Sequence, residues 1–305
     1  IWRSFTHWIG GMGVLVFILC LLPLTGGYHM NLMKAESPGP SVSKLVPKVQ
    51  STAKILYTIY IILTIVEIIF LLIGKMPLFD TLCLSFGTAG TGGFGIKNDS
   101  IASYSTYNQV VITVFMILFG INFNAYYLLL TKKVMQAAKN EEVRYYLGII
   151  GLAIVAIAIN TREMFTSFGR AFQQAAFQVG SIITTTGYAT TDFNVWPVFS
   201  KTILVILMFV GACAGSTGGG IKVSRLLILC KSARKELQLY LHPNAVKKIK
   251  MDDKAIPHEV VRATNMFLFV YIMIFVISLL IISLDNLDMV SNFTAIAATL
   301  NNIGP

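Results

Sequence analysis

The chain has 305 residues, of which 55% are hydrophobic and 12% are charged, and its formal net charge is +10. A soluble domain carries about 25% charged residues, so this composition excludes an ordinary soluble protein and indicates a membrane protein. A positive net charge is also typical of nucleic-acid-binding proteins, so the positions of the basic residues have to separate these two classes.

Six apolar stretches are predicted to cross a membrane, which requires a helix of about 20 apolar residues. In chain order they cover residues 9–24, 55–73, 110–130, 145–159, 202–214 and 266–284. The first and the fourth are slightly short, and Trp2 and Trp8 beside the first suit the membrane interface. The fifth is interrupted by the sequence GSTGGG and resumes at Ile221.

Three shorter apolar segments are predicted to be half helices that enter the membrane and turn back. They cover residues 78–88, 171–184 and 291–299, so each spans about half of the hydrocarbon at 1.5 Å per residue. Each follows a long apolar helix and ends in a glycine-containing turn, with the sequence TAGTGGFG, TTTGYATT or TLNNIGP. The order long helix, half helix, turn, long helix is therefore an internal repeat.

The repeat indicates a fragment of a four-repeat chain. Its expected divisions are the inner helix of repeat 1 with a cytoplasmic loop (1–53), repeat 2 (54–140), repeat 3 with an intramembrane loop (141–250), and the start of repeat 4, truncated at its turn (251–305). Two repeats are thus expected to be whole.

Basic residues identify the cytoplasmic side of this predicted topology. The three loops that join the repeats carry 18 Lys and Arg residues, whereas the opposite side carries six. Because cytoplasmic loops are enriched in Lys and Arg, the half helices are predicted to enter from the outside. The positive charge then marks orientation beside the headgroups of the lipid bilayer, and no nucleic-acid partner is expected.

The glycine turns lie at membrane depth, where irregular backbone is tolerated only beside protein or a water-filled cavity. Glycine lets successive carbonyls point the same way, and rings of carbonyls can replace the hydration shell of K⁺. We therefore interpret the turns as strands of a selectivity filter, with Tyr188 wedging its turn against its own half helix. Asp99 and Asp192 follow two turns, and either raise the local cation concentration or are ordinary solvated acids. The predicted fold is all-α and polytopic, with helix–pore helix–filter–helix units around a central pore.

The sequences GTAGTGGFG, IITTTGYATTD and TLNNIGP resemble the filters of the Trk/Ktr/HKT superfamily of potassium transporters. GACAGSTGGGIKVSR is similar to the broken inner helix of the third repeat in that family, and LHPNAV resembles a cytoplasmic loop of the bacterial Trk-type membrane subunit (TrkH-like). The resemblance covers the whole chain. It implies four repeats around one pore, a homodimer, and a multi-pass protein of the bacterial cytoplasmic (inner) membrane.

The resemblance also assigns residues. The implied potassium-binding filter residues are Thr91, Gly92, Gly93, Phe94, Thr185, Thr186, Gly187, Tyr188, Asn302, Ile303 and Gly304. The implied gating loop, which obstructs the pore within the membrane, is Gly215, Ser216, Thr217, Gly218, Gly219 and Gly220. K⁺ is the expected transported ion, Rb⁺ should be accepted, and no cofactor is expected on this chain. Nucleotide would bind to a cytoplasmic regulatory subunit (TrkA-like).

Three hypotheses for the function follow. Potassium uptake driven by the membrane potential is the leading one. An ion-coupled potassium symporter, using Na⁺ or H⁺, also suits broken helices, although its sign would be inverted repeats and the predicted units share one orientation. A membrane enzyme would need paired acids, a His cluster or a nucleophile with its base, and Glu67 alone does not supply these, so the chain is not expected to be an enzyme.

Overall fold

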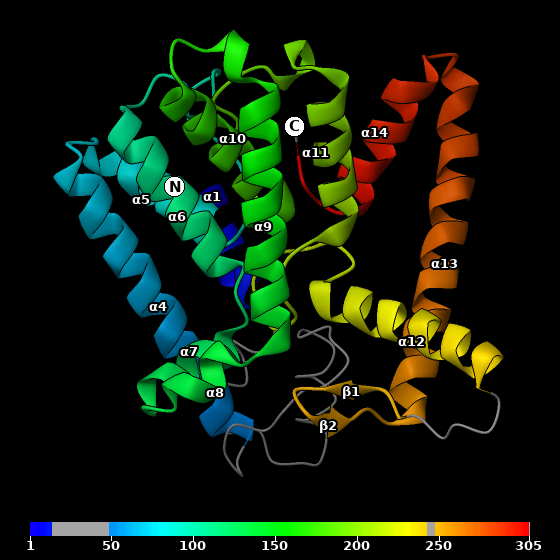
Figure 1. Ribbon diagram of the computed structural model, residues 1–305. Coiled ribbons are helices and arrows are strands. Elements are labelled where there is room, and N and C mark those ends of the chain that lie inside the picture. The colour runs from blue at the N-terminus through cyan, green and yellow to red at the C-terminus, as the bar shows by residue number, and fades with distance from the viewer. Residues whose placement is uncertain (14–48, 243–247, 305) are drawn as a thin grey trace.

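The chain is helical almost throughout in the computed structural model, which describes residues 1–13, 49–242 and 248–304 (Figure 1). Within these ranges three helices are long and apolar enough to cross a membrane, or four if one bent pair counts as a single span. The long helices are α4 (Val49–Ile73), α9 (Glu141–Asn160) and α13 (His258–Ile282). They confirm three of the six predicted spans. The first predicted span begins as α1 (Trp2–Gly11), and its residues 14–24 lie outside the described residues.

The predicted span 110–130 is bent. It forms α6 (Thr106–Phe119) and α7 (Phe123–Leu130), which meet at an angle of 91°. The break is stabilised locally, because the Asn122 side chain accepts a hydrogen bond from the backbone N–H of Asn124 at 2.9 Å and so caps α7. The predicted span is therefore broken into two helices, and α7 with the short α8 (Val134–Ala138) lies at the lower end of the molecule (Figure 1).

The three predicted half helices are present as α5 (Leu78–Ala89), α10 (Phe168–Ile183) and α14 (Met289–Leu300). All three begin at the upper end of the molecule, opposite to α8 and α12 (Figure 1). Side-chain caps help to start two of them: the Ser167 hydroxyl accepts from the N–H of Arg170, and the Asp288 carboxylate accepts from the N–H of Ser291. Short 3₁₀ turns, η1 (Arg162–Met164), η2 (Phe193–Val195) and η3 (Ser283–Asp285), lie in the upper connections.

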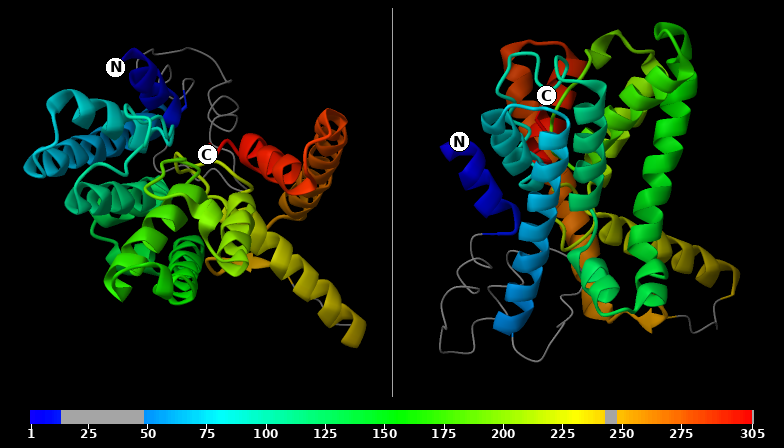
Figure 2. Two further views of the ribbon diagram at one scale, coloured as in Figure 1. Left: turned by 90° about the horizontal axis from the view of Figure 1, so that it is seen from above. Right: turned by 90° about the vertical axis from the view of Figure 1, so that its left-hand side faces the viewer.

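The predicted span 202–214 ends early. Its helix, α11 (Val198–Val210), stops at a glycine-rich loop, residues 211–222, and α12 (Val223–Leu241) then runs across the lower end of the molecule (Figures 1 and 2). The prediction that an apolar span resumes at Ile221 is therefore wrong beyond the first turns of α12. Lys and Arg residues recur along α12, and charged side chains are costly within hydrocarbon. A two-stranded antiparallel hairpin, β1 (Lys250–Met251) and β2 (Lys254–Ala255), follows.

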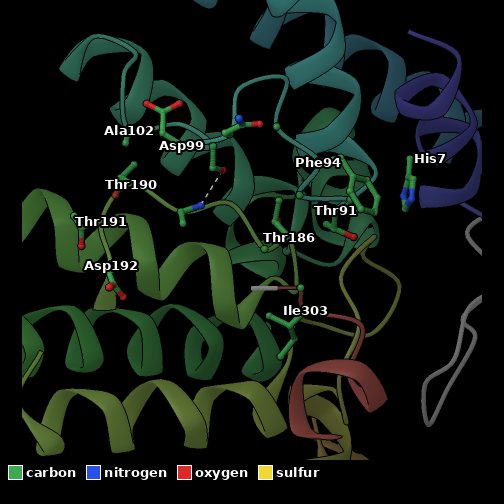
Figure 3. A pocket seen from close by; sticks show the side chains of 18 of the residues that line it. His7, Thr91, Phe94, Asp99, Ala102, Thr186, Thr190, Thr191, Asp192 and Ile303 are labelled. Atoms are coloured by element: carbon green, nitrogen blue, oxygen red, sulfur yellow. Dashed lines mark hydrogen bonds between the residues drawn. The ribbon is translucent and has the colours of Figure 1, made fainter. Parts of the chain in front are cut away.

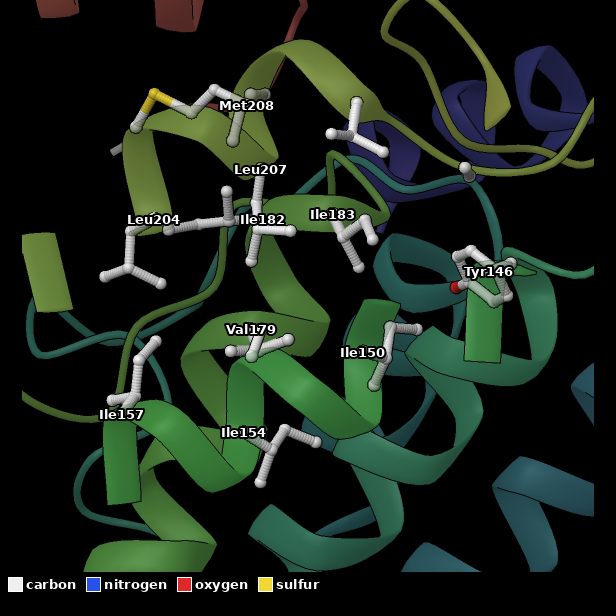
Figure 4. Packing of buried hydrophobic residues seen from close by; sticks show 14 of the residues in the cluster. Tyr146, Ile150, Ile154, Ile157, Val179, Ile182, Ile183, Leu204, Leu207 and Met208 are labelled. Atoms are coloured by element: carbon white, nitrogen blue, oxygen red, sulfur yellow. The ribbon is translucent and has the colours of Figure 1, made fainter. Parts of the chain in front are cut away.

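Two apolar cores hold the helices together. One joins α9, α10 and α11 through Ile154, Val179, Leu207 and their neighbours (Figure 4). The other joins α1, α4, α5 and α6 around Tyr60 and Phe119. By contrast, only 6% of the apolar stretch of α13 is buried, and an apolar surface of this kind suits lipid.

Viewed from above, the helices surround one centre (Figure 2, left). The α1 helix, the α4–α6 group, the α9–α11 group and the α13–α14 pair occupy successive sectors, and the C-terminal end of the chain lies near the middle. This arrangement brings the ends of the three half helices together.

Candidate functional site

The three half helices end in the same hydrogen-bonded motif. After α5, the N–H of Thr91 donates to the carbonyl of Thr88 at 3.1 Å, and the N–H of Gly92 donates to the carbonyl of Gly87 at 2.7 Å. The equivalent bonds after α10 are Thr185 to Ile182 (3.0 Å) and Thr186 to Ser181 (2.9 Å), and after α14 they are Asn302 to Thr299 (3.1 Å) and Ile303 to Ala298 (2.9 Å). This is the Schellman pattern of a helix end.

The backbone angles repeat as well. Each turn has a non-glycine residue with positive φ and, two residues later, a glycine with positive φ. The pairs are Thr91 (52°) and Gly93 (63°), Thr185 (59°) and Gly187 (87°), and Asn302 (56°) and Gly304 (92°). Non-glycine residues rarely adopt this region, so its recurrence at three matched positions indicates one shared backbone design.

The three turns meet in a cavity of about 620 Å³. Nine predicted filter residues line it: Thr91, Gly92, Gly93, Phe94, Thr186, Gly187, Asn302, Ile303 and Gly304. Thr91, Thr186 and Ile303 come from the turns after α5, α10 and α14, respectively, and their side chains are labelled in Figure 3. The turns touch closely, because a Cβ atom added to Gly93 would collide with the Thr186 carbonyl, and one on Gly304 would lie 3.5 Å from the Gly187 Cα.

Thr185 and Tyr188 are the two predicted filter residues that do not line this cavity. The hydroxyl of Thr185 accepts a hydrogen bond from the N–H of Gly219 at 2.6 Å, so it faces the glycine-rich loop. Tyr188 is fully buried and its hydroxyl donates to the carbonyl of Leu84 on α5 at 3.2 Å. The hydroxyl therefore bonds to α5, the half helix that precedes its own in the chain, and the ring shares an apolar cluster with Phe177 of its own half helix, α10. This half helix also binds the Tyr188 carbonyl, through the Ser181 hydroxyl at 2.6 Å.

Hydrogen bonds at the upper rim of the cavity join the connection after α5 to the connection after α10. The N–H of Ile101 donates to the carbonyl of Ala189 at 3.0 Å, and the N–H of Ala189 donates to the Ser100 hydroxyl at 3.2 Å. Nearby, burial and the adjacent Asp80 carboxylate raise the pKa of Tyr104. Its hydroxyl therefore stays protonated and donates to Asp80 at 2.8 Å. These bonds hold the connection after the turn of repeat 2 in place.

Asp99 and Asp192 both line the cavity and are exposed (Figure 3). The Asp192 carboxylate also accepts the N–H of Asn194 at 2.9 Å and caps η2, so it has a local structural role. Both acids remain available to attract cations, since a solvated carboxylate still contributes to the field at a mouth.

The glycine-rich loop, residues 211–222, lies directly against the inner side of the three turns. A Cβ on Gly218 would lie 2.8 Å from the Thr184 carbonyl, and one on Gly219 would lie 2.8 Å from the Asn301 carbonyl. The hydroxyl of Thr91 donates to the carbonyl of Thr217 at 3.1 Å. The loop thus contacts the ends of the three half helices α5, α10 and α14, and at Gly218 and Gly219 it approaches more closely than a residue with a Cβ could.

Further hydrogen bonds tie this loop to the break between α6 and α7. The N–H of Cys213 donates to the carbonyl of Gly120 at 3.0 Å, and the carbonyl of Gly215 accepts from the N–H of Phe123 at 3.0 Å. Within the loop, the buried Lys222 ammonium donates to the carbonyl of Gly218. The loop is therefore ordered by the surrounding helices as well as by the turns.

Three of these contributors were not identified from the sequence. The Glu142 carboxylate accepts the N–H groups of Ala214 and Ser224, on either side of residues 215–220. Lys222 donates to the Gly218 carbonyl within the loop, and the Ser181 hydroxyl donates to the Tyr188 carbonyl. The pair Glu141–Glu142 ahead of an apolar run indicates a helix start, which is correct but says nothing about the loop. The Asn122 side chain, at the break between α6 and α7, bonds to another helix by donating to Glu142 at 3.2 Å.

Glu67 lies in α4, fully buried, and neither carboxylate oxygen has a hydrogen-bond partner among the described residues. Over residues 1–13, 49–242 and 248–304, no group of three or more His, Cys, Asp or Glu side chains is placed to hold a metal ion. The polar groups that the three turns bring to the shared cavity are backbone carbonyls and hydroxyls.

Comparison with known proteins is consistent across sequence and structure. Residues 1–305 match the family TrkH, described as cation transport protein. Proteins named Trk system potassium uptake protein TrkH are similar to the chain: the one from Vibrio parahaemolyticus is 38% identical and the one from Salmonella typhimurium is 35% identical, in each case over 100% of this chain and 64% of the relative. The crystal structure of the potassium transporter TrkH from Vibrio parahaemolyticus superposes with a TM-score of 0.84 at 35% identity, covering 99% of this chain and 63% of that one.

The chain spans somewhat less than two thirds of the length of these relatives. Its apolar helices and its relatives together identify a membrane protein. The match of the family over every residue, with relatives above 30% identity, settles the assignment: this chain belongs to the TrkH family of cation transport proteins.

Proposed function

We propose that the protein containing this chain takes up K⁺ through a pore whose selectivity filter includes the turns 91–94, 185–188 and 302–304. The observation that carries this proposal is the threefold recurrence of one backbone design at one cavity: a Schellman helix end, a positive φ, and a positive-φ glycine. A filter made of backbone carbonyls needs backbone order and repetition more than particular side chains. The relatives named as potassium uptake proteins support K⁺ as the ion.

The loop at residues 215–220 is the proposed gate. It lies against the inner side of the turns, where a permeating ion leaves the filter, and its closest contacts are made by Gly218 and Gly219. A segment with no regular secondary structure and several glycines can change its backbone angles at low cost. We therefore expect the described arrangement to be closed, and opening to require displacement of this loop.

The membrane potential is the proposed driving force. A potential of 100 mV supplies roughly 2.3 kcal/mol per charge, which supports roughly fiftyfold accumulation of a monovalent cation. The alternative is a symporter that couples K⁺ to Na⁺ or H⁺. Glu67 is consistent with coupling to H⁺, because a buried carboxyl group without a hydrogen-bond partner among the described residues can bind and release a proton.

Partners and location complete the proposal. The four-repeat division, with repeat 2 at residues 54–140 and repeat 3 at residues 141–250, predicts one pore per chain, and the family resemblance implies a homodimer in the bacterial cytoplasmic membrane. The basic face formed by the loops between repeats would receive a nucleotide-binding regulatory subunit. Rb⁺ should permeate, because its size is close to that of K⁺ and a backbone filter of three unlike turns has limited discrimination.

The decisive test is ⁸⁶Rb⁺ uptake by the full-length protein in a strain that lacks potassium uptake. Gly187→Ser should abolish uptake or change the preference among Rb⁺, K⁺ and Na⁺, because Gly187 has a φ of 87° and lines the cavity. Gly148→Ser is the matched control, since nothing lies within 4 Å of a Cβ at Gly148 on α9. Equal Rb⁺ uptake and unchanged preference for Gly187→Ser, at equal expression, would contradict the filter proposal and favour the coupled transporter.

A further inference from the structure

Glu142 is a buried carboxylate in the first turn of α9 that binds segments far away in the chain. Its Oε1 accepts the backbone N–H of Ala214 at 2.6 Å and that of Ser224 at 3.1 Å, and its Oε2 accepts from Nδ2 of Asn122 at 3.2 Å. The residue is 2% exposed. Ala214 precedes residues 215–220 and Ser224 follows them, so a single carboxylate oxygen holds the chain on both sides of these six residues.

This arrangement makes the carboxylate and the loop depend on each other. A buried carboxylate is costly unless it accepts hydrogen bonds, and bonds to an ionised acceptor are about twice as strong as neutral ones. The N-terminus of α9 also favours a negative charge at this place. If the loop leaves, Glu142 loses two of its three hydrogen bonds, and water has to replace them. Displacing the loop therefore costs more than the loop's own contacts with the turns.

The N-terminus of α9 is also hydrogen-bonded, on its exposed side, to the hairpin formed by β1 and β2. The carboxylate of Asp252, between β1 and β2, accepts the N–H of Glu141 at 2.7 Å and Nδ2 of Asn140 at 3.4 Å. Lys231 of α12 pairs with Glu141 and also donates to the carbonyl of Lys250 at 2.8 Å. The hairpin, α12 and the start of α9 thus form one bonded unit, with Glu142 on its inner side and Asp252 on its exposed side.

We propose that Glu142 is a positioning residue that latches the loop 215–220 against the turns, and that the β1–β2 hairpin sets this latch from the basic face of the protein. The inference rests on the proposed function, in which this loop obstructs the cation path. A partner that binds the hairpin and draws Asp252 away from α9 would loosen the start of that helix, move Glu142, and free both ends of the loop together.

The first test is the concentration dependence of ⁸⁶Rb⁺ uptake by the full-length protein. Glu142→Gln keeps the shape and one acceptor oxygen but removes the charge, and Glu142→Ala removes the acceptor. Loss of charge-assisted bonds should shift the closed-to-open ratio by about tenfold, so the maximal uptake rate should rise. The half-saturating concentration and the preference for Rb⁺ over Na⁺ should not change, because the turns are intact. Glu163→Gln, an exposed acid beyond the other end of α9, is the matched control and should equal the wild type.

The second test follows the loop without measuring transport. Ser216→Cys places a thiol in the loop, and its reaction rate with a cationic methanethiosulfonate reagent can be measured by peptide mass spectrometry. Native Cys213 lies three residues away in the same peptide, so fragmentation of the labelled peptide has to locate the modified residue, and the wild-type protein gives the rate of Cys213 alone. The rate should rise about tenfold when Glu142→Gln is added, since the same shift in the closed-to-open ratio exposes the loop. It should stay at the Ser216→Cys value when Glu163→Gln is added.

The hairpin is tested by a double-mutant cycle on the same two readouts. Asp252→Asn should raise the thiol reaction rate and the maximal uptake rate in the wild-type background. In the Glu142→Gln background it should add nothing, because the latch through which it acts is already weakened. Additive effects of the two changes would overturn the role of the hairpin.

An unchanged thiol reaction rate in both Glu142→Gln and Glu142→Ala would overturn the latch. So would a fall in uptake without a faster thiol reaction, in protein that elutes as the wild type does in size-exclusion chromatography. These outcomes are separate from failure of the filter proposal. If Gly187→Ser leaves uptake and preference unchanged, the pore assignment fails, whereas the thiol rates still report whether Glu142 holds the loop.

Discussion

The turns 91–94 and 185–188 have the same backbone but different surroundings. Both follow a Schellman helix end, and in both a threonine and a glycine have positive φ. In the second, Tyr188 is fully buried and bonded to α5. In the first, the corresponding Phe94 is 36% exposed and lies under Arg3, whose guanidinium carbon is 3.5 Å from the ring centroid, and beside His7 of α1.

This difference separates two requirements of such a site. The backbone conformation of each turn is determined locally, because the N–H groups of the turn bond to carbonyls of its own half helix. The conformation is therefore the same in two different side-chain environments. The side-chain contacts that hold a turn in place are not local, because they depend on which neighbouring helix packs against the aromatic ring: α5 for Tyr188 and α1 for Phe94. We infer that the turn 185–188 is fixed mainly by α5 and that the turn 91–94 is fixed mainly by contact with its neighbour and with α1.

The largest expected effect contrasts the two aromatic anchors. Tyr188→Ala should lower the stability of the protein by about 3–5 kcal/mol, because it leaves a cavity in the core around α5 where the fully buried ring packs. Phe94→Ala should cost about 1 kcal/mol or less, since that ring is already partly solvated. Thermal unfolding of the full-length protein in one detergent would measure both. Equal losses of stability would remove the distinction between a buried and a peripheral anchor.

A smaller effect is expected where the two turns touch. Gly93→Ala adds a methyl group that collides with the Thr186 carbonyl and demands a positive φ from alanine, at about 1–2 kcal/mol for the φ alone. We expect Rb⁺ uptake to fall about tenfold or more, because each 1.4 kcal/mol corresponds to a factor of ten. Gly151→Ala on α9, where nothing lies within 4 Å of the added Cβ, should retain uptake. Normal uptake by Gly93→Ala would show that the two turns move independently.

The smallest effect concerns the acids at the mouth. Asp99→Asn and Asp192→Asn should each reduce the rate of Rb⁺ uptake at low ionic strength by about twofold, because a surface carboxylate raises the local cation concentration. The reduction should disappear at about 0.5 M of an impermeant salt, where screening acts over a few ångströms. Asp192→Asn should also lower stability slightly, since Asp192 caps η2. A reduction that persists in high salt would instead indicate a structural role for both acids.

Apolar periodicity and the glycine turns predicted the three half helices and their turns, and the family resemblance assigned the individual filter residues. The three half helices α5, α10 and α14 were placed within a few residues of their observed bounds, and nine of the eleven predicted filter residues line the shared cavity. These features can be predicted from the sequence because a helix must be long and apolar to lie in hydrocarbon, and because only a few residue types fit a tight turn. The excess of basic residues in the loops between the predicted repeats likewise predicts which face of the molecule is cytoplasmic.

Contacts between distant segments were decided only by the tertiary structure. The bond from Tyr188 to α5 and the position of the loop 215–220 against the turns each join residues more than 100 positions apart. Glu142 shows the reason most clearly. In the sequence it is one of two acids that begin a helix, and only the packed protein brings Ala214 and Ser224 to the same oxygen. Hydrophobicity and local turn chemistry act along the chain, whereas a buried charge is satisfied by whichever donors the fold carries to it.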